Sequence, residues 1–107
     1  MAYSERFTAA ELEKIIDAGM IYMCACPAMV ADSLRKLREM YRYQLNCLED
    51  PENCSAVHQS IARNTAIAHA QMQDCLDEVL VLEEWDRTTL DMPAGLRQRQ
   101  TKEMQAD

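Results

Sequence analysis

The sequence predicts an all-α protein, because residues that favour helices dominate the chain and residues that favour turns are scarce. The 107 residues include only two Gly and three Pro, and eight Met contribute to a hydrophobic share of 49%. Apolar residues recur at steps of three and four in three segments, as in helices that bury one face. We therefore predict one domain over residues 1–88, a helical hairpin preceded by a shorter helix in an antiparallel three-helix arrangement.

The first helix is predicted over residues 8–24 from its capping residues. Thr8 and Glu11 have the spacing of a capping box, in which a hydroxyl and a carboxylate each satisfy an unpaired backbone N–H group. Phe7 and Leu12 stand beside this box at the positions of a hydrophobic staple. The apolar stripe that follows comprises Leu12, Ile16, Gly19, Met23 and Cys26.

The second helix is predicted over residues 27–48. Pro27 suits the first helical position, because a helix leaves the N–H there without a partner and the φ of proline is already helical. The inner stripe comprises Val30, Leu34, Leu37, Tyr41 and Leu48. Three arginines, Arg35, Arg38 and Arg42, are expected on the solvent side of this helix.

The third helix is predicted over residues 51–86 and is the longest. Asp50 and Pro51 have the order of a helix cap followed by a proline at the first helical position, and a start at Ser55 is the alternative. The inner stripe comprises His58, Ile61, Thr65, Ala68, Met72, Cys75, Val79 and Leu82. Gln73 lies off this stripe and is expected at the surface.

The length of the third helix predicts an oligomer. Its last turns, with Leu80, Leu82 and Trp85, extend past the other two helices and need an apolar cover. We expect a second subunit to supply this cover, so that a homodimer completes a larger helical bundle. The helical pattern breaks at Met92 and Pro93, and the residues beyond are mostly polar. We therefore expect residues 89–107 to form a mobile tail.

Charge and hydropathy exclude several classes of partner. The formal net charge is −7, whereas nucleic acids and anionic membranes are bound by clustered Lys and Arg. The chain has no run of about 20 apolar residues that would span a bilayer. The first twenty residues lack the pattern of a secretory leader, so we expect a cytoplasmic protein in a reducing environment.

The cysteines are placed symmetrically about the predicted hairpin turn. Cys26 and Cys75 are equally far from this turn, and so are Cys47 and Cys54, so the hairpin should bring each pair face to face. Such pairs are compatible with disulfides, with a shared metal ion or with simple packing, and spacing alone does not choose among these.

Two groups of residues are candidate metal or redox sites. The first group comprises Cys24, Cys26 and Met29, at the corner between the first two helices, together with Cys75. It is a candidate soft-metal site for Cu(I) or Zn(II), or a candidate site of thiol exchange. The structural alternative is that these side chains simply pack in a small core.

The second group lies at the opposite end of the hairpin and comprises Cys47, Cys54 and His58. These are two thiols and one imidazole within reach of one zinc ion. The structural alternative is that His58 sits at the edge of the core, bonded to a polar neighbour. His69 is expected to be structural or exposed.

A hairpin with two facing cysteine pairs resembles, in topology, the coiled-coil-helix domains of oxidative compartments, although the 21-residue spacing within Cys26–Cys47 and Cys54–Cys75 is longer. The resemblance implies paired cysteines and thiol-redox chemistry. Phosphate-binding loops and nucleophile elbows, which need glycines, are absent from the sequence. We therefore predict a non-enzymatic helical interaction module, with a cysteine-dependent metal-binding or thiol-redox protein as the alternative.

Overall fold

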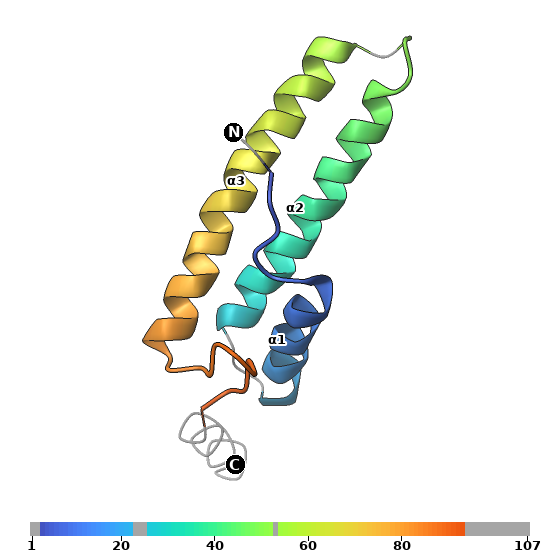
Figure 1. Ribbon diagram of the computed structural model, residues 1–107. Helices are drawn as coiled ribbons and strands as arrows, with labels where there is room; N and C mark the ends of the chain where they lie inside the picture. Colours follow the sequence, from blue (N-terminus) through green and yellow to red (C-terminus); the bar gives the residue numbers. More distant parts are fainter. Residues whose placement is uncertain (1–2, 23–25, 53, 94–107) are drawn as a thin grey trace, which may run out of the picture.

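The computed structural model describes residues 3–22, 26–52 and 54–93, and its regular structure consists of three α-helices. These are α1 (Ala9–Tyr22), α2 (Cys26–Leu48) and α3 (Ser55–Leu82). Helices α2 and α3 form a long antiparallel hairpin, and α1 packs against α2 at the end away from the hairpin turn (Figure 1). The all-α prediction with three helices is confirmed.

The start of α1 follows the predicted capping box. The Thr8 hydroxyl accepts the Glu11 N–H at 3.0 Å, and the Glu11 carboxylate accepts the Thr8 N–H at 2.8 Å. Phe7 and Leu12 are both buried, as a hydrophobic staple requires. These local interactions explain why the helix begins at Ala9. The last two residues of the predicted helix, 23 and 24, lie outside the described residues.

Helix α3 begins at Ser55, so the predicted start at residue 51 is wrong and the alternative start is right. The Asp50 carboxylate accepts the Glu52 N–H at 2.9 Å, which closes a turn between the helices. Because this carboxylate is engaged in the turn, it does not cap a helix. Cys54 occupies the N-cap position of α3 without a side-chain cap hydrogen bond.

Helix α3 ends at Leu82, four residues before the predicted end, because the chain reverses in a Schellman motif. The Trp85 N–H donates to the Leu80 carbonyl at 2.9 Å, and the Glu84 N–H donates to the Val81 carbonyl at 3.0 Å. Glu84 adopts the left-handed conformation that the motif requires, with φ 61°. The reversal brings Trp85 back over the end of its own helix.

Replacing Glu84 with glycine is expected to stabilise the protein by about 1 kcal/mol, because a left-handed conformation costs a non-glycine residue about 1–2 kcal/mol and costs glycine almost nothing. Glu84 is exposed, so little packing is lost with its side chain. Urea denaturation would measure the gain. Glu83→Gly is the comparison, because Glu83 has φ −91° and its carboxylate accepts the Trp85 indole N–H, so glycine there should only destabilise. Equal effects of the two substitutions would contradict this account.

The segment after α3, residues 83–93, is here called the C-terminal loop. Its Trp85, Leu90 and Met92 are buried, with exposures of 6%, 2% and 3%. The Asp86 carboxylate accepts the N–H groups of Thr88 and Thr89, at 2.8 and 3.0 Å, and these hydrogen bonds lower the pKa of Asp86. The predicted boundary at residue 88 is therefore too early, since Leu90 and Met92 belong to the core. Residues 94–107 of the predicted tail lie outside the described part of the chain.

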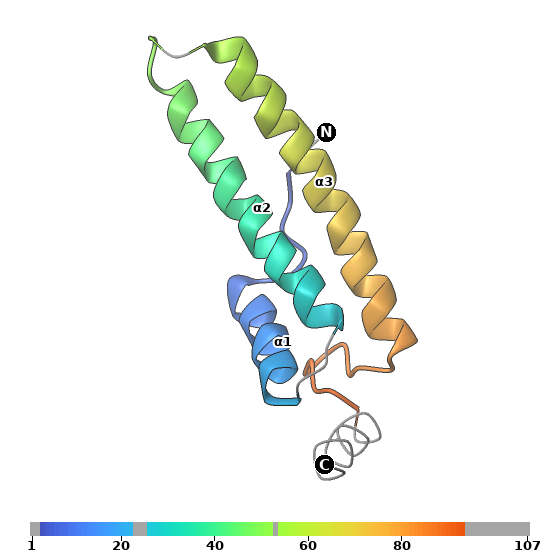
Figure 2. The same cartoon turned by 180° about the vertical axis from the view of Figure 1, so that it is seen from behind.

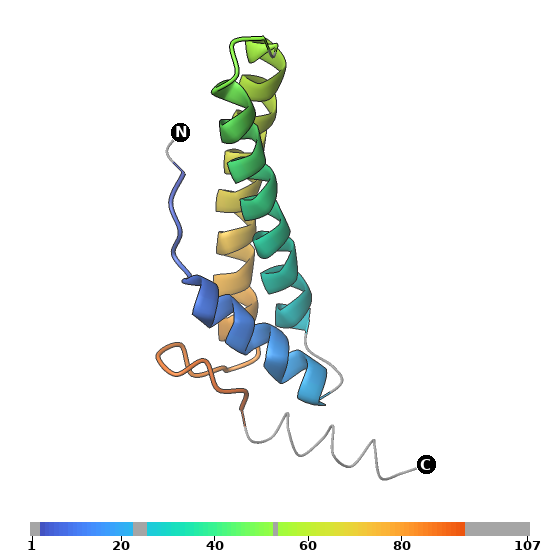
Figure 3. The same cartoon turned by 90° about the vertical axis from the view of Figure 1, so that its right-hand side faces the viewer.

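The core lies at the end of the hairpin where α1 and the C-terminal loop pack (Figure 3). It comprises Phe7, Leu12, Ile15, Ala31, Leu34, Leu76, Leu80, Trp85, Leu90 and Met92. Toward the hairpin turn, α2 and α3 extend past α1 as a two-helix arm. Within the described ranges, no helix has the length and hydropathy needed to cross a membrane.

Candidate interaction surface

The α2–α3 hairpin has two broad faces, and the described chain covers only one of them. The C-terminal loop and residues 3–7, here called the strap, lie on the front face, whereas α1 starts at the front and runs diagonally past the lower end of α2 along its outer edge (Figure 3). From behind, α2 and α3 stand in the foreground and the strap passes beyond them (Figure 2). No described segment crosses this rear face, so any apolar residues on it are open to a partner.

The rear face of α2 is recognised by helical geometry. Arg38 reaches the strap through a 2.7 Å hydrogen bond to the Phe7 carbonyl, so its side of α2 is the front. Met40 follows Arg38 by two residues and Met29 precedes it by nine, and at about 100° per residue both lie on the opposite side. Tyr43, three residues after Met40, continues this stripe. These three apolar side chains are 47% (Met40), 75% (Met29) and 64% (Tyr43) exposed.

Helix α3 contributes a parallel stripe. Asp77, which binds Arg6 of the strap, marks its front side. The rear stripe lies about 140–180° around the helix from Asp77 and recurs at steps of three, four and seven residues: Val57, Ile61, Ala68, Cys75, Val79 and Leu82. The two ends of the stripe, Val57 and Leu82, are 51% and 72% exposed, and the residues between them are half-buried. Together with Met29, Met40 and Tyr43 on α2, this stripe is here called the rear apolar face.

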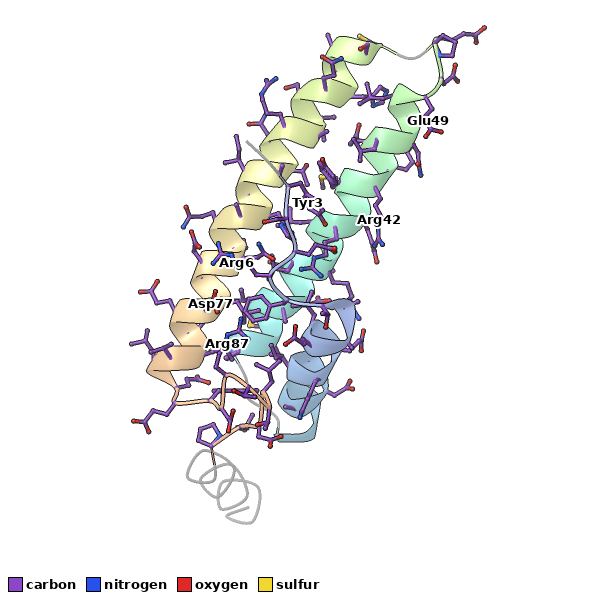
Figure 4. All side chains as sticks on the ribbon, viewed as in Figure 1. Tyr3, Arg6, Arg42, Glu49, Asp77 and Arg87 are labelled. Carbon is purple, nitrogen blue, oxygen red and sulfur yellow. The ribbon has the colours of Figure 1, made fainter. Side chains whose placement is uncertain are left out.

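Most described ion pairs lie away from the rear apolar face. Arg6 binds Asp74 and Asp77 and Arg87 binds Asp77, which ties the strap and the C-terminal loop to α3 (Figure 4). Arg35 joins α2 to Glu13 of α1 at 2.6 Å. The front of the hairpin is thus occupied by the protein's own charged contacts, whereas the rear offers apolar side chains. Contiguous exposed apolar residues of this kind are typical of protein-binding surfaces.

The front face holds a buried polar cluster beneath the strap, here called the clasp: Arg38, His69 and Gln73. These three side chains are 4%, 1% and 1% exposed. The Arg38 Nε–H donates to His69 Nε2 at 2.9 Å, so the imidazole is the acceptor at that nitrogen. Burial and, after it, the charge of Arg38 lower the pKa of His69. The expected exposure of Arg38 and Gln73 is therefore wrong, and His69 is structural.

The clasp binds the main chain of the strap. Gln73 accepts the Arg6 N–H at 2.7 Å through Oε1 and donates to the Ser4 carbonyl at 3.0 Å through Nε2. These bonds, with the one from Arg38 to the Phe7 carbonyl, satisfy backbone groups that the extended strap cannot pair internally. Buried polar side chains are favourable when they are paired in this way.

The residues of the first predicted metal or redox site are spread along exposed and half-buried positions. Cys26 is exposed at the first position of α2, Met29 is 75% exposed, and Cys75 is half-buried on α3. Neither Cys26 nor Cys75 forms a disulfide. Cys24 lies outside the described residues, so the Cys24–Cys26 corner is not described as a unit.

At the second predicted metal site, His58 pairs with a glutamine side chain. His58 Nδ1 lies 2.6 Å from Gln44 Oε1, which is a hydrogen bond when the proton is on Nδ1. This contact is the polar pairing that the structural alternative predicted for His58. Cys54 is exposed and Cys47 half-buried, and neither forms a disulfide. Among the residues with described positions, no group of three or more His, Cys, Asp or Glu side chains is arranged to hold a metal ion.

The three residues of the predicted oligomer interface, Leu80, Leu82 and Trp85, do not share one environment in the structure. Leu80 and Trp85 are 1% and 6% exposed, because the C-terminal loop folds over them, and they belong to the core of the chain. Leu82 is 72% exposed and belongs to the rear apolar face. The cover that the end of α3 needs thus comes from the same chain.

Comparisons with known proteins provide no relative: no protein-family model, no curated protein and no solved structure matches the chain.

Proposed function

We propose that the protein is a non-enzymatic helical interaction module whose rear apolar face binds a second copy of the chain. The observation that supports this proposal is the pair of parallel apolar stripes on α2 and α3, which no described segment covers. Two such hairpins packed through these stripes would form a four-helix core, in which the apolar faces of all four helices are buried. A homodimer of this kind uses the same surface on both subunits.

The apolar character of the rear apolar face favours a second copy over a partner recognised by ion pairs. Each chain carries a formal net charge of −7, which opposes self-association at a distance. The most exposed apolar residues of the rear apolar face, Met29, Tyr43, Val57 and Leu82, are uncharged. Lys36 shares this side of α2, but it is already paired with Asp32 at 3.1 Å within its own helix. An apolar face of equal shape and length is the complementary surface, and the chain itself provides one.

The rear apolar face is large enough for a specific interface. Helix α2 has 23 residues. At about 1.5 Å per residue it is about 35 Å long, and two helices side by side are about 18 Å wide, so the face covers about 600 Å² per subunit. Two such faces bury about 1,200 Å² in total, at the lower end of the range for specific interfaces. This size is consistent with a dimer in equilibrium with monomer.

Leu82→Glu is expected to weaken the dimer by at least tenfold in dissociation constant, because it places a desolvated charge in the contact on each subunit. Sedimentation equilibrium over a concentration series would measure the change. Val81→Glu is the matched control, since Val81 is 70% exposed next to Leu82 but lies about 100° around the helix, toward the side of Asp77. It should leave the dissociation constant unchanged.

A wild-type protein that stays monomeric at concentrations of about 100 μM would overturn the proposed dimer. Equal weakening by Val81→Glu and Leu82→Glu would show that net charge, and not the rear apolar face, controls association. Native mass spectra of the same samples test the cysteine-dependent alternative, which predicts bound Cu(I) or Zn(II), or a loss of about 2 Da for each disulfide. The proposed cytoplasmic location is consistent with an apo dimer whose cysteines stay reduced.

A further inference from the structure

We propose that the strap is a pH-sensitive latch: protonation of His69 releases residues 3–6 from the clasp and opens the front of the hairpin. The latch is distinct from the proposed dimer, because the strap and the rear apolar face lie on opposite sides of α2 and α3. It rests on the geometry of the clasp, in which a guanidinium donates to an imidazole in a site closed to water.

The hydrogen bond between Arg38 and His69 exists only with a neutral imidazole. The Arg38 Nε–H points at His69 Nε2 across 2.9 Å, so that nitrogen must keep its lone pair. When Nε2 takes a proton, two N–H donors and two positive charges face each other at this distance. The exposures of 4% for Arg38 and 1% for His69 leave no water shell to screen them, so one side chain must move.

Movement of either side chain removes support from the strap. Arg38 also donates to the Phe7 carbonyl, at 2.7 Å, and pairs with the Glu5 carboxylate at 3.4 Å. The His69 ring lies against the ring of Tyr3, with centroids 4.8 Å apart, and Tyr3 stacks on Tyr41 of α2 at 4.2 Å. One proton therefore disturbs contacts at three positions of the strap.

The far end of the strap is anchored independently of His69. The Phe7 side chain is fully buried in the core, and the Arg87 guanidinium covers its ring at 4.2 Å. Thr8 is held by the capping box of α1. Opening is thus expected to stop at Phe7, so that residues 3–6 move as a flap hinged at that residue. This movement also breaks the bonds of Gln73 to Ser4 and Arg6 and the ion pairs of Arg6 with α3.

The charged groups around His69 influence how readily its imidazole takes up a proton. Arg38 from α2 and Arg6 from the strap disfavour a second cation, whereas Glu5 from the strap favours it. Asp74 and Asp77, on the same helix as His69, are engaged by Arg6, and Arg42 of α2 acts on the neighbouring Tyr3.

The sign of the pH effect follows from the two states of the imidazole. Burial lowers the pKa of His69 in the closed state. In the open state the ring meets water and its pKa returns toward the ordinary value of about 6.5. The open state therefore binds more protons below pH 6.5, and the closed state loses its advantage as the pH falls from there toward the lowered pKa.

NMR relaxation of uniformly ¹⁵N-labelled protein between pH 7.5 and 5.0 would test the latch. The order parameters of the strap amides are expected to fall from about 0.85 to below about 0.6, with the midpoint at which the His69 ring nitrogen signals titrate. The amides of Phe7 and α1 should keep their values. A strap that stays rigid while His69 titrates, or a His69 that does not titrate in this range, would overturn the proposal.

Variants separate His69 from the other groups. His69→Gln places an amide, which can accept from Arg38 but does not titrate, and its strap should stay closed at pH 5.0. His58→Gln is the matched control and should open as wild type does, because His58 pairs with Gln44 near the hairpin turn, away from the strap. If His69→Gln fails to fold, Glu5→Gln still decides the matter. It removes the ion pair of the strap with Arg38 and the neighbour that stabilises a charged imidazole in the closed state, so opening should move to higher pH. Unchanged opening in either His69→Gln or Glu5→Gln would contradict the latch.

Discussion

Replacing Trp85 with alanine is expected to lower the free energy of unfolding by about 3–5 kcal/mol, as for other large core residues. Trp85 is 6% exposed and packs in the core with Leu80 and Leu90. Its indole N–H donates to the Glu83 carboxylate at 2.9 Å, so the ring is buried without an unpaired donor. The substitution leaves a cavity under the C-terminal loop, and the loop has few other apolar anchors.

Urea denaturation at pH 7.5 and one fixed protein concentration would measure the loss, since an associating protein unfolds at a concentration-dependent midpoint. Leu82→Ala is the control, because Leu82 is 72% exposed and should cost less than about 1 kcal/mol in a monomer. Trp85→Ala should leave the dissociation constant of the proposed dimer near the wild-type value, once the measurement is corrected for the fraction of unfolded protein. A variant that is as stable as wild type but monomeric would mean that Trp85 lies in an interface after all.

Replacing Arg38 with methionine is expected to destabilise the protein by about 3 kcal/mol at pH 7.5. Methionine keeps the apolar part of the Arg38 side chain but has no N–H groups. Helix α2 then donates no hydrogen bond within the clasp. The Phe7 carbonyl and His69 Nε2 then lose a donor in a site closed to water, and a buried polar group left unpaired costs about 1–3 kcal/mol.

A double-mutant cycle isolates the bond between Arg38 and His69. His69→Leu removes the acceptor, so the double variant should lose less than the sum of the two single losses, by about 1 kcal/mol. Arg35→Met is the surface control, because Arg35 is 45% exposed and its ion pairs with Glu13 and Asp32 should contribute less than about 1 kcal/mol. Strictly additive losses, or an Arg38→Met variant as stable as Arg35→Met, would contradict the role assigned to the clasp.

The sequence predicts the parts of this fold that depend on near neighbours. Thr8 and Glu11 are three residues apart, and their capping box forms through backbone groups of the same turn. The stripes at steps of three and four predict all three helices. Asp50 is ambiguous from sequence alone, because an aspartate before a proline suits both a helix cap and a turn, and only the path of the chain decides between them.

The buried polar residues differ from the expected surface positions, although the sequence carries a signal for them. Arg38 falls four residues after Leu34 and seven after Ala31, so it continues the buried front side of α2. Gln73 likewise follows His69 by four and precedes Leu76 by three on α3. A long polar side chain at a core position of the helical period indicates a buried hydrogen-bond network when an extended segment lies nearby, and here that segment is the strap.

The C-terminal loop could not be predicted from local patterns. Trp85, Leu90 and Met92 have no helical or strand period, and the reversal that buries them depends on a left-handed Glu84, a conformation that sequence rules reserve for glycine. The same reversal turned the predicted interface at Leu80 and Trp85 into core. The rear apolar face was only partly visible in the sequence, because its stripe on α3 was interpreted as an inner face.

The contact of Arg87 with the Phe7 ring joins the two ends of the described chain. Contacts between residues so far apart close a long loop, and the entropy lost in this closure makes them form late. The α2–α3 hairpin, whose partners are close in sequence near Asp50, requires no such closure. We therefore expect the hairpin to form first as a template, with α1, the strap and the C-terminal loop docking afterwards, so that substitutions of Phe7 act mainly by speeding unfolding rather than by slowing folding.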